Sequence, residues 1–218
     1  MNRSPFIDAL GQDLDRASSG VKQHFSQSEG VHLYRGTMRN VWRRDGWQGL
    51  LARPFLWLGS LSDNLFPETG TDVPFELENS ISDLPDGRTA MRWSRTFYFK
   101  HITRRFYACM VFDAEKGVIV DLLGKDGKLE VELCPRIEHG SLCITSRRQW
   151  MKLGPLQLRV PPWFAGEAHV REWDEPGGTF GISVTIHNPL LGPFFGYQGT
   201  FAEAGQAWDN LKAGRATA

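Results

Sequence analysis

The sequence lacks the features that mark many catalytic or nucleic-acid-binding proteins. Among its 218 residues, 25 basic residues balance 25 acidic ones, so no net charge attracts DNA or RNA. It has no G-x-S-x-G nucleophile motif. The glycine-rich stretches at 177–181 and 192–199 do not lead from a strand into a helix, which argues against a dinucleotide site. We predict no catalytic residue, no cofactor and no nucleic-acid partner.

Cysteine is scarce, and long apolar runs are missing. Cys109, Cys134 and Cys143 are too few for a disulfide framework and suit a reducing compartment. Cys134, His139 and Cys143 flank one expected hairpin, but C-x-x-C spacing and a fourth ligand are lacking, so we predict no metal site. The N-terminus has no signal-peptide pattern, and the longest chargeless apolar run near it, 54–62, is too short to cross a bilayer. These absences predict a cytoplasmic protein.

The chain does contain a long succession of short strands, most of them between residues 72 and 201. Turn sequences such as Asp86-Gly87 and Lys125-Asp126-Gly127 separate them. Such short connections cannot hold the crossover helices that parallel strands require, so we expect antiparallel pairing. The expected strands are 30–39, 74–80, 89–99, 104–112, 118–123, 129–134, 142–150, 156–160, 168–173, 180–187 and 195–201.

Helices are expected mainly in residues 1–66. Ser4 and Pro5 form a helix start and Gly11 a stop. A second helix is predicted over 13–25. The apolar segment 40–66 has helical spacing but contains Pro54, which predicts two short helices meeting there. A final short helix is predicted over 203–212.

Together these patterns predict one domain over residues 1–218 of the α+β class, dominated by β structure. We expect a large antiparallel curved sheet or barrel of about nine to eleven strands. Short N-terminal helices would cover one face or opening. A curved sheet of this size can hold one small ligand.

One charged side chain falls on an apolar face. Side chains alternate along a strand, so Arg95 shares a face with Met91, Trp93, Phe97 and Phe99. A guanidinium there is costly unless it is paired.

Glu172, in phase with two apolar residues of its own strand, is the candidate partner of Arg95. The two residues predict either a polar pocket floor that binds a carboxylate or other head group, or a structural ion pair or a strand end that reaches solvent. Trp93, Phe97, Phe99 and Trp57 would supply the wall of the pocket.

The segment 41–66 is rich in Trp, Phe and Leu with interspersed Arg. Three interpretations stay open. The segment packs on the sheet, forms a lid over the open end of a barrel, or contacts a membrane surface.

Several motifs resemble a bacterial family known as domain of unknown function 4166, and they run through nearly the whole chain. They are Tyr34-Arg35-Gly36, Gly70-Thr71-Asp72-Val73-Pro74-Phe75, Trp93-Ser94-Arg95-Thr96-Phe97, Asn188-Pro189-Leu190-Leu191-Gly192 and Phe195-Gly196-Tyr197-Gln198-Gly199-Thr200-Phe201. The resemblance implies no established activity. Some relatives are similar to the C-terminal part of proteins whose front half looks like a saccharopine-dehydrogenase-type dinucleotide domain. We expect no such front half here, although a separate reductase partner is compatible with the resemblance.

The leading functional hypothesis is non-catalytic binding of an apolar or amphipathic, lipid-like molecule inside the barrel. One alternative is an enzyme or accessory domain that works with a dinucleotide-dependent reductase, which requires titratable groups converging in a cavity. The other is a protein-interaction module, which requires a filled core and an external aromatic patch.

Overall fold

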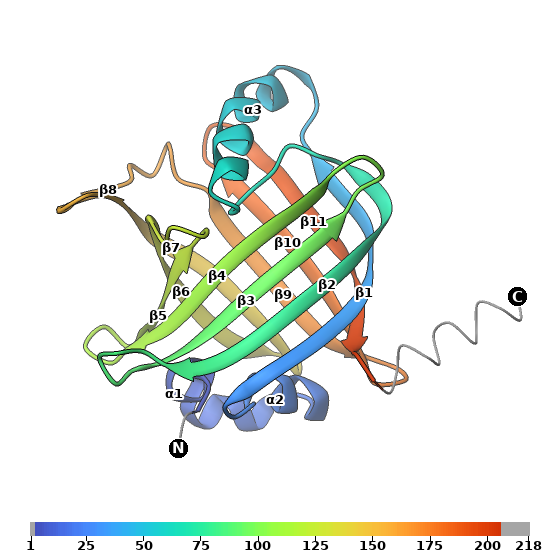
Figure 1. Ribbon diagram of the computed structural model, residues 1–218, viewed down its shortest axis with the longest axis vertical. Coiled ribbons are helices and arrows are strands. Elements are labelled where there is room, and N and C mark those ends of the chain that lie inside the picture. The colour runs from blue at the N-terminus through green and yellow to red at the C-terminus, as the bar shows by residue number, and fades with distance from the viewer. Residues whose placement is uncertain (1–2, 206–218) are drawn as a thin grey trace, which may run out of the picture.

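The chain forms a closed β-barrel with helices over both ends (Figure 1). This computed structural model describes residues 3–205. The helices are α1 (Pro5–Leu10), the 3-10 helix η1 (Gly11–Arg16), α2 (Ser19–Phe25) and α3 (Gly46–Leu61). The strands are β1 (Gly30–Arg43), β2 (Gly70–Asp83), β3 (Thr89–Tyr98), β4 (Thr103–Asp113), β5 (Val118–Leu123), β6 (Leu129–Glu138), β7 (Ser141–Leu153), β8 (Leu156–Arg159), β9 (Glu167–Glu175), β10 (Thr179–Asn188) and β11 (Gly192–Glu203).

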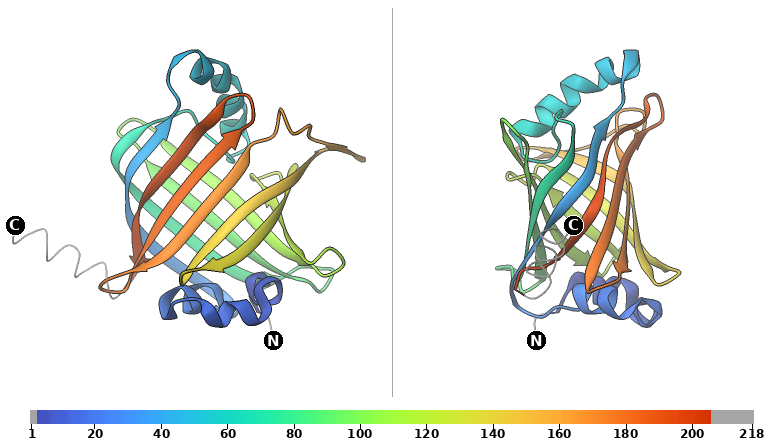
Figure 2. Two further views of the ribbon diagram at one scale, coloured as in Figure 1. Left: turned by 180° about the vertical axis from the view of Figure 1, so that it is seen from behind. Right: turned by 90° about the vertical axis from the view of Figure 1, so that its right-hand side faces the viewer.

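The strands hydrogen-bond in the order β6-β5-β4-β3-β2-β1-β11-β10-β9-β7-β8, and a further pairing of β6 with β7 closes the barrel. Neighbouring strands run antiparallel. β8 stays outside the closed ring and projects from the barrel wall as the second arm of a hairpin with β7 (Figures 1 and 2). The predicted β-dominated antiparallel barrel is confirmed.

β1 is longer than its sequence pattern predicted, because a bulge changes which side chains face inward. Against β11 the register shifts by one residue between Met38 and Asn40, which leaves Arg39 as the extra residue, whereas against β2 the register is unchanged. Before the bulge Tyr34 and Met38 are buried, and after it Val41 is buried. An extra residue shifts the alternation by one. The strand therefore continues to Arg43 instead of ending at Arg39.

The N-terminal helices close one end of the barrel. The Phe6 N–H donates a hydrogen bond of 3.3 Å to the Ser4 hydroxyl, and Gly11 ends α1 with a φ of 52°, as predicted. The expected helix over 13–25 is divided into η1 and α2. The Ser18 N–H donates to the Gly140 carbonyl at 2.9 Å, which ties the start of α2 to the turn between β6 and β7.

α3 covers the opposite end (Figure 2). The prediction of two short helices is wrong, because α3 is one helix with Pro54 inside it. Proline removes one intrahelical hydrogen bond, that of the Leu50 carbonyl. Both residues lie on the exposed side of the helix, where water can solvate that carbonyl. Only Gly49, Ala52 and Leu56 of α3 are buried.

Two glycines of β11 mark close approaches of the backbone, as predicted. A Cβ at Gly199 would lie 2.2 Å from the Thr37 carbonyl oxygen, and one at Gly196 would lie 2.5 Å from the Val184 carbonyl oxygen. Of the helix predicted over 203–212, Glu203 is instead the last residue of β11 and Ala204 and Gly205 form a turn, and the remainder lies outside the described residues. Within residues 3–205, none of the helices has the length and apolar character needed to cross a membrane.

Candidate ligand-binding cavity

The barrel interior has a filled half and a hollow half. Aromatic rings fill the half next to the N-terminal helices, where the centroids of Phe6 and Phe25 are 4.8 Å apart and those of Tyr34 and Phe201 are 5.8 Å apart. A cavity of about 1250 Å³ occupies the half next to α3. This volume exceeds the range of about 300–1000 Å³ that is typical of small-molecule sites. The cavity can therefore hold a large organic guest.

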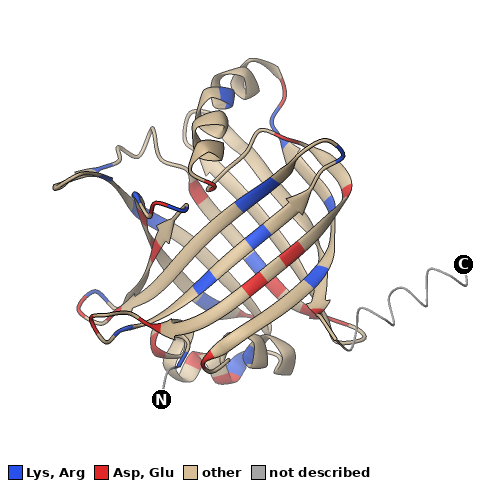
Figure 3. Cartoon of the chain, in the orientation of Figure 1, with Lys and Arg blue, Asp and Glu red and all other residues tan. Residues whose placement is uncertain are grey.

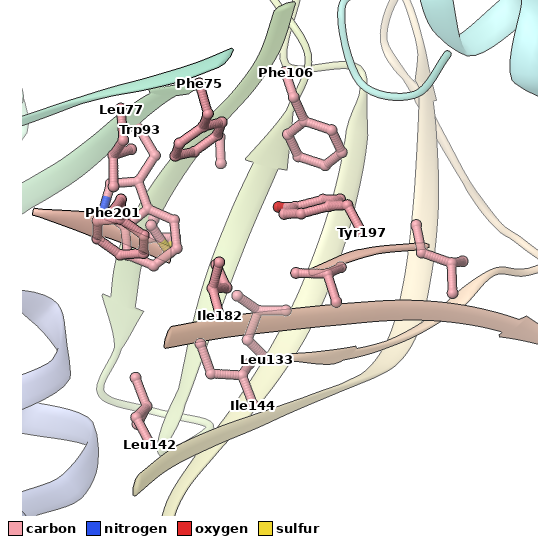
Figure 4. Close-up of a cluster of buried hydrophobic side chains, with 14 of the residues drawn as sticks. Phe75, Leu77, Trp93, Phe106, Leu133, Leu142, Ile144, Ile182, Tyr197 and Phe201 are labelled. Atoms are coloured by element: carbon pink, nitrogen blue, oxygen red, sulfur yellow. The ribbon is translucent and has the colours of Figure 1, made fainter. Parts of the chain in front are cut away.

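The cavity wall is mainly apolar and comes from α3 and from the strands β3 to β11, whereas β1 and β2 contribute no lining residue. It includes Phe106, Met110, Leu133, Ile144, Val184 and Phe195. Phe106, Leu133, Ile144 and Tyr197 project into the interior from β4, β6, β7 and β11 (Figure 4). Alternation along each strand delivers these side chains, since every second residue points inward.

Arg95 lies in this wall and is only 7% exposed. Met91, Trp93 and Phe97 on the same strand are buried with it, so the predicted inward face of β3 is confirmed. The guanidinium lies 4.6 Å from the centroid of the Trp93 ring and 5.0 Å from that of Phe106. Two aromatic faces partly compensate a desolvated cation. Among the described residues, no carboxylate forms an ion pair with Arg95.

Asp121 of β5 is the second buried ionisable group of the wall, beside the exposed Arg159 at its edge. Burial raises the pKa of its carboxyl to about 7, against opposing effects of the Arg95 charge and of the Cys109 backbone N–H. A carboxyl group with this pKa can gain or lose a proton near neutral pH.

Three lining side chains carry buried polar atoms with no hydrogen-bond partner among the described residues. They are Trp93 Nε1, Asp121 Oδ1 and Tyr197 Oη. Buried polar atoms in proteins are almost always satisfied, and each exception requires an explanation. The Arg95 guanidinium lies over the Trp93 ring, and its charge opposes the effect of burial on the pKa of Asp121 and of Tyr197. The four side chains therefore form one polar cluster in the wall of the apolar cavity.

Glu172 is also buried but belongs to a different cluster from the cavity wall. One of its oxygens lies 3.6 Å from His24 Nδ1 of α2, and both side chains are inaccessible or nearly so. Burial raises the pKa of Glu172 to about 8, against the lowering effect of Arg95, and the Asp174 charge raises it further. Burial lowers the pKa of His24 to about 3. The contact is therefore between neutral groups near neutral pH.

The six residues predicted to bind a ligand occupy different places. Arg95 and Trp93 line the cavity. Phe97 lies in the aromatic core against Phe66, Phe75 and Tyr197, and Phe99 is half-buried against Phe66.

Trp57 lies on α3 and is 57% exposed. The cavity lining does not include Trp57, Phe97, Phe99 or Glu172. The structure does not bring the six residues together. Ligand binding by any of them stays a prediction.

Sequence reasoning missed Asp121, Tyr197 and His24. For Asp121 the signal was present, because it alternates in phase with Ile119 and Leu123 on β5. This is the same signal that identified Arg95. Tyr197 and His24 gave no comparable signal, since an aromatic ring on an inward face usually indicates core.

Two segments narrow the mouth of the cavity. The ring of Phe55 on α3 contacts that of Phe164, in the loop between β8 and β9, with centroids 4.7 Å apart. The Arg44 N–H donates to the Phe194 carbonyl at one end of α3, and the Lys125 N–H donates to the Ser62 carbonyl at the other, both at 2.9 Å. α3 is thus fixed at its two ends and crosses the opening as a lid.

No cluster of His, Cys, Asp and Glu suited to a metal ion occurs within residues 3–205. Cys109, Cys134 and Cys143 are free thiols. Burial raises the pKa of Cys109 and of Cys143. Neither of these two thiols is activated as a nucleophile.

Comparison with known proteins identifies the family. The family described as Domain of unknown function (DUF4166) matches residues 19–201. The chain belongs to this family. A relative, the uncharacterized protein YndH of Bacillus subtilis (strain 168), is 36% identical over 179 residues, which cover 81% of this chain and 86% of that protein. No solved structure matches the chain significantly.

Proposed function

We propose that this DUF4166 protein binds an amphipathic small molecule inside the barrel, with an apolar body and an acidic or otherwise hydrogen-bond-accepting head group. The observation that carries the proposal is one buried cation, Arg95, in the wall of a cavity of about 1250 Å³ that is otherwise mainly apolar. A carboxylate or phosphate placed beside Arg95 would pair a charge that otherwise remains desolvated. The apolar tail would fill the space towards α3.

The hollow half of the barrel favours this function over a simple interaction module. A protein that uses only its surface gains nothing from a cavity of this size, because a cavity weakens packing. The unpartnered Trp93 Nε1 and Tyr197 Oη belong to two side chains of the lining and would donate to a head group that displaced their neighbours. Small-molecule sites combine such an apolar wall with a few polar groups.

The test is an equilibrium titration of delipidated protein with a fluorescent long-chain fatty acid. Replacing Arg95 with Met keeps most of the side-chain volume and removes the cation. We expect the affinity to fall about tenfold to a hundredfold, as for the loss of a hydrogen bond to a charged group. We expect the free energy of unfolding to stay constant or rise, because a desolvated cation has been removed.

Arg92→Met is the matched control. Arg92 lies on the same strand but outside the cavity lining, and its guanidinium donates to Ser82. Its replacement should leave the affinity unchanged. Equal losses of stability and affinity in Arg95→Met would instead assign Arg95 a structural role.

A second candidate function is proton transfer to or from the bound guest. Asp121 favours it, because its carboxyl lies in the same wall and burial raises its pKa to about 7. A general acid or base works best with a pKa near the operating pH. If this is correct, the protein will convert its co-purified compound in a mass-spectrometric time course, and Asp121→Asn will bind that compound without converting it. No conversion by the unmodified protein would leave binding as the sole activity.

A further inference from the structure

We infer that the α3 end of the barrel docks on an anionic lipid bilayer, with the mouth of the cavity facing the membrane. The inference rests on the proposed function, since it describes the route by which an amphipathic guest enters and leaves. It concerns a different surface from the site around Arg95. The two proposals can therefore fail separately.

Large apolar side chains are concentrated in three segments around the mouth, which we call the apolar rim: residues 46–62, 153–166 and 189–194. Exposed members include Trp47, Leu50, Trp57, Leu156, Trp163 and Leu190, each more than half accessible. Soluble proteins rarely expose contiguous apolar patches of more than a few hundred Å², and larger ones mark sites of contact with membranes or partners.

The exposed rings of the rim are held in place by buried polar side chains. The Asn188 amide nitrogen donates to the Trp163 carbonyl at 3.0 Å and to the Ala165 carbonyl at 2.8 Å. Gln149 donates to the Gly166 carbonyl in the same loop. The loop is therefore fixed with Trp163 and Phe164 exposed. A loop that is fixed while its aromatic rings stay exposed is expected of a surface that binds a membrane or a partner.

The outer face of α3 has the composition of an interfacial helix. Leu50, Arg53, Pro54 and Trp57 follow helical spacing, are exposed, and do not line the cavity. Trp is enriched where a membrane meets water, because its ring is apolar and its N–H is polar. Arg can extend from such a face to lipid phosphates.

The charge of the rim matches an anionic surface. The three segments contain two charged residues, Arg53 and Arg159, and both are cationic. Residues of both charges lie along the strands of the barrel, whereas α3 contains a single charged residue, which is cationic (Figure 3). An acidic residue would be repelled by anionic head groups; the rim contains none, and Asp45 and Asp63 lie immediately outside residues 46–62.

A bilayer explains why the rim surrounds the cavity mouth. An apolar guest that leaves the cavity through this mouth would pass between Phe55, Phe164 and their neighbours. A membrane in contact with the rim would receive the guest without exposing it to water. The β7–β8 hairpin, with exposed Leu153, Leu156 and Leu158, extends this apolar surface beyond the barrel wall (Figure 1).

The test is flotation of the full chain with vesicles of phosphatidylcholine alone and of phosphatidylcholine mixed with phosphatidylglycerol. We expect the protein to float with the mixed vesicles and to be released by high salt. The double variant Leu50→Glu/Trp57→Glu should stay at the bottom of the gradient. Arg53→Gln/Arg159→Gln should lower the partition coefficient onto mixed vesicles about twenty-five-fold, at about fivefold for each cation.

Val31→Glu is the matched control, because Val31 is equally exposed but lies at the start of β1, at the end opposite α3. It should float like the unmodified protein. The inference is overturned if mixed vesicles do not bind the protein, or if Val31→Glu loses as much binding as the rim variant. It is also overturned if the rim instead forms a dimer that Leu50→Glu/Trp57→Glu dissociates.

The cavity is tested separately in the same assay. Arg95→Met should float normally, and Leu50→Glu/Trp57→Glu should still bind the fluorescent fatty acid in solution. Flotation without fatty-acid binding would overturn the proposed function, and fatty-acid binding without flotation would overturn the docking.

Discussion

The two ends of the barrel are both covered by helices rich in aromatic and aliphatic side chains, but they use these side chains in opposite ways. At the N-terminal end Phe6, Val21 and Phe25 are 0% exposed. At the other end Trp47 and Leu50 of α3 are 65% and 62% exposed. Apolar composition alone does not distinguish these two roles, whereas the direction of the side chains does.

The difference shows how a barrel can be both stable and hollow. The N-terminal helices fill their half with a continuous core, which supplies apolar burial. α3 buries little and leaves a cavity behind it, so we expect it to contribute less to stability. In the proposed function it covers the entrance of the cavity. One end acts as a plug and the other as a lid.

The largest difference between the two ends is expected in the free energy of unfolding when one aromatic residue at each end is truncated to alanine. Phe25→Ala removes a fully buried ring and should lower the free energy of unfolding by about 3–5 kcal/mol. Trp57→Ala removes an exposed ring and should change it by less than about 0.5 kcal/mol. Urea unfolding followed by circular dichroism measures both. Similar losses in the free energy of unfolding for the two variants would show that the two ends contribute equally to stability.

A second difference concerns how the two buried carboxyl groups make the stability of the folded state depend on pH. Burial raises the pKa of Glu172 from its ordinary 4.5 to about 8, and that of Asp121 from 3.8 to about 7. In the unfolded chain both ionise at lower pH, so the folded state binds the extra protons and stability falls as pH rises through these ranges. The pKa of His24 is lowered from 6.5 to about 3, so His24 reduces stability only below about pH 6.5.

Between pH 7 and 8 the loss therefore belongs mainly to Glu172, near the plug. We expect the unmodified protein to lose roughly 1 kcal/mol over this interval, and Glu172→Gln to remove most of the loss. Asp121→Asn should instead reduce the pH dependence of the free energy of unfolding below pH 7. Chemical denaturation at a series of pH values checks both expectations. An unchanged slope in Glu172→Gln would contradict a neutral Glu172 in the folded state.

The smallest difference in stability is expected from the residues that precede the first turns of α1 and α3. The buried Ser4 hydroxyl accepts a hydrogen bond at the start of α1, whereas the side chain of Asp45 makes no capping bond to α3. Ser4→Ala should cost about 1 kcal/mol, and Asp45→Ala less than about 0.5 kcal/mol. Thermal unfolding ranks the two variants. A larger loss in Asp45→Ala would show that α3 contributes more to stability than its burial indicates.

Most of the fold could be predicted from the sequence because the alternation of side chains and the turn residues are local signals. The bulge at Arg39 and the continuous helix through Pro54 could not, since both depend on tertiary context. Both buried charged groups of the cavity wall could be predicted from the sequence, although only Arg95 was. Arg95 and Asp121 stand out against the apolar phase of their strands, whereas the positions of Phe97 and Trp57 relative to the cavity depend on how the barrel closes.

Native mass spectrometry of the freshly purified protein tests the central claim most directly, before and after addition of a long-chain fatty acid. The account predicts a protein ion that carries one small molecule, that loses it on denaturation, and that binds the added acid after delipidation. A bare protein ion in both measurements would contradict the claim that the barrel holds a guest.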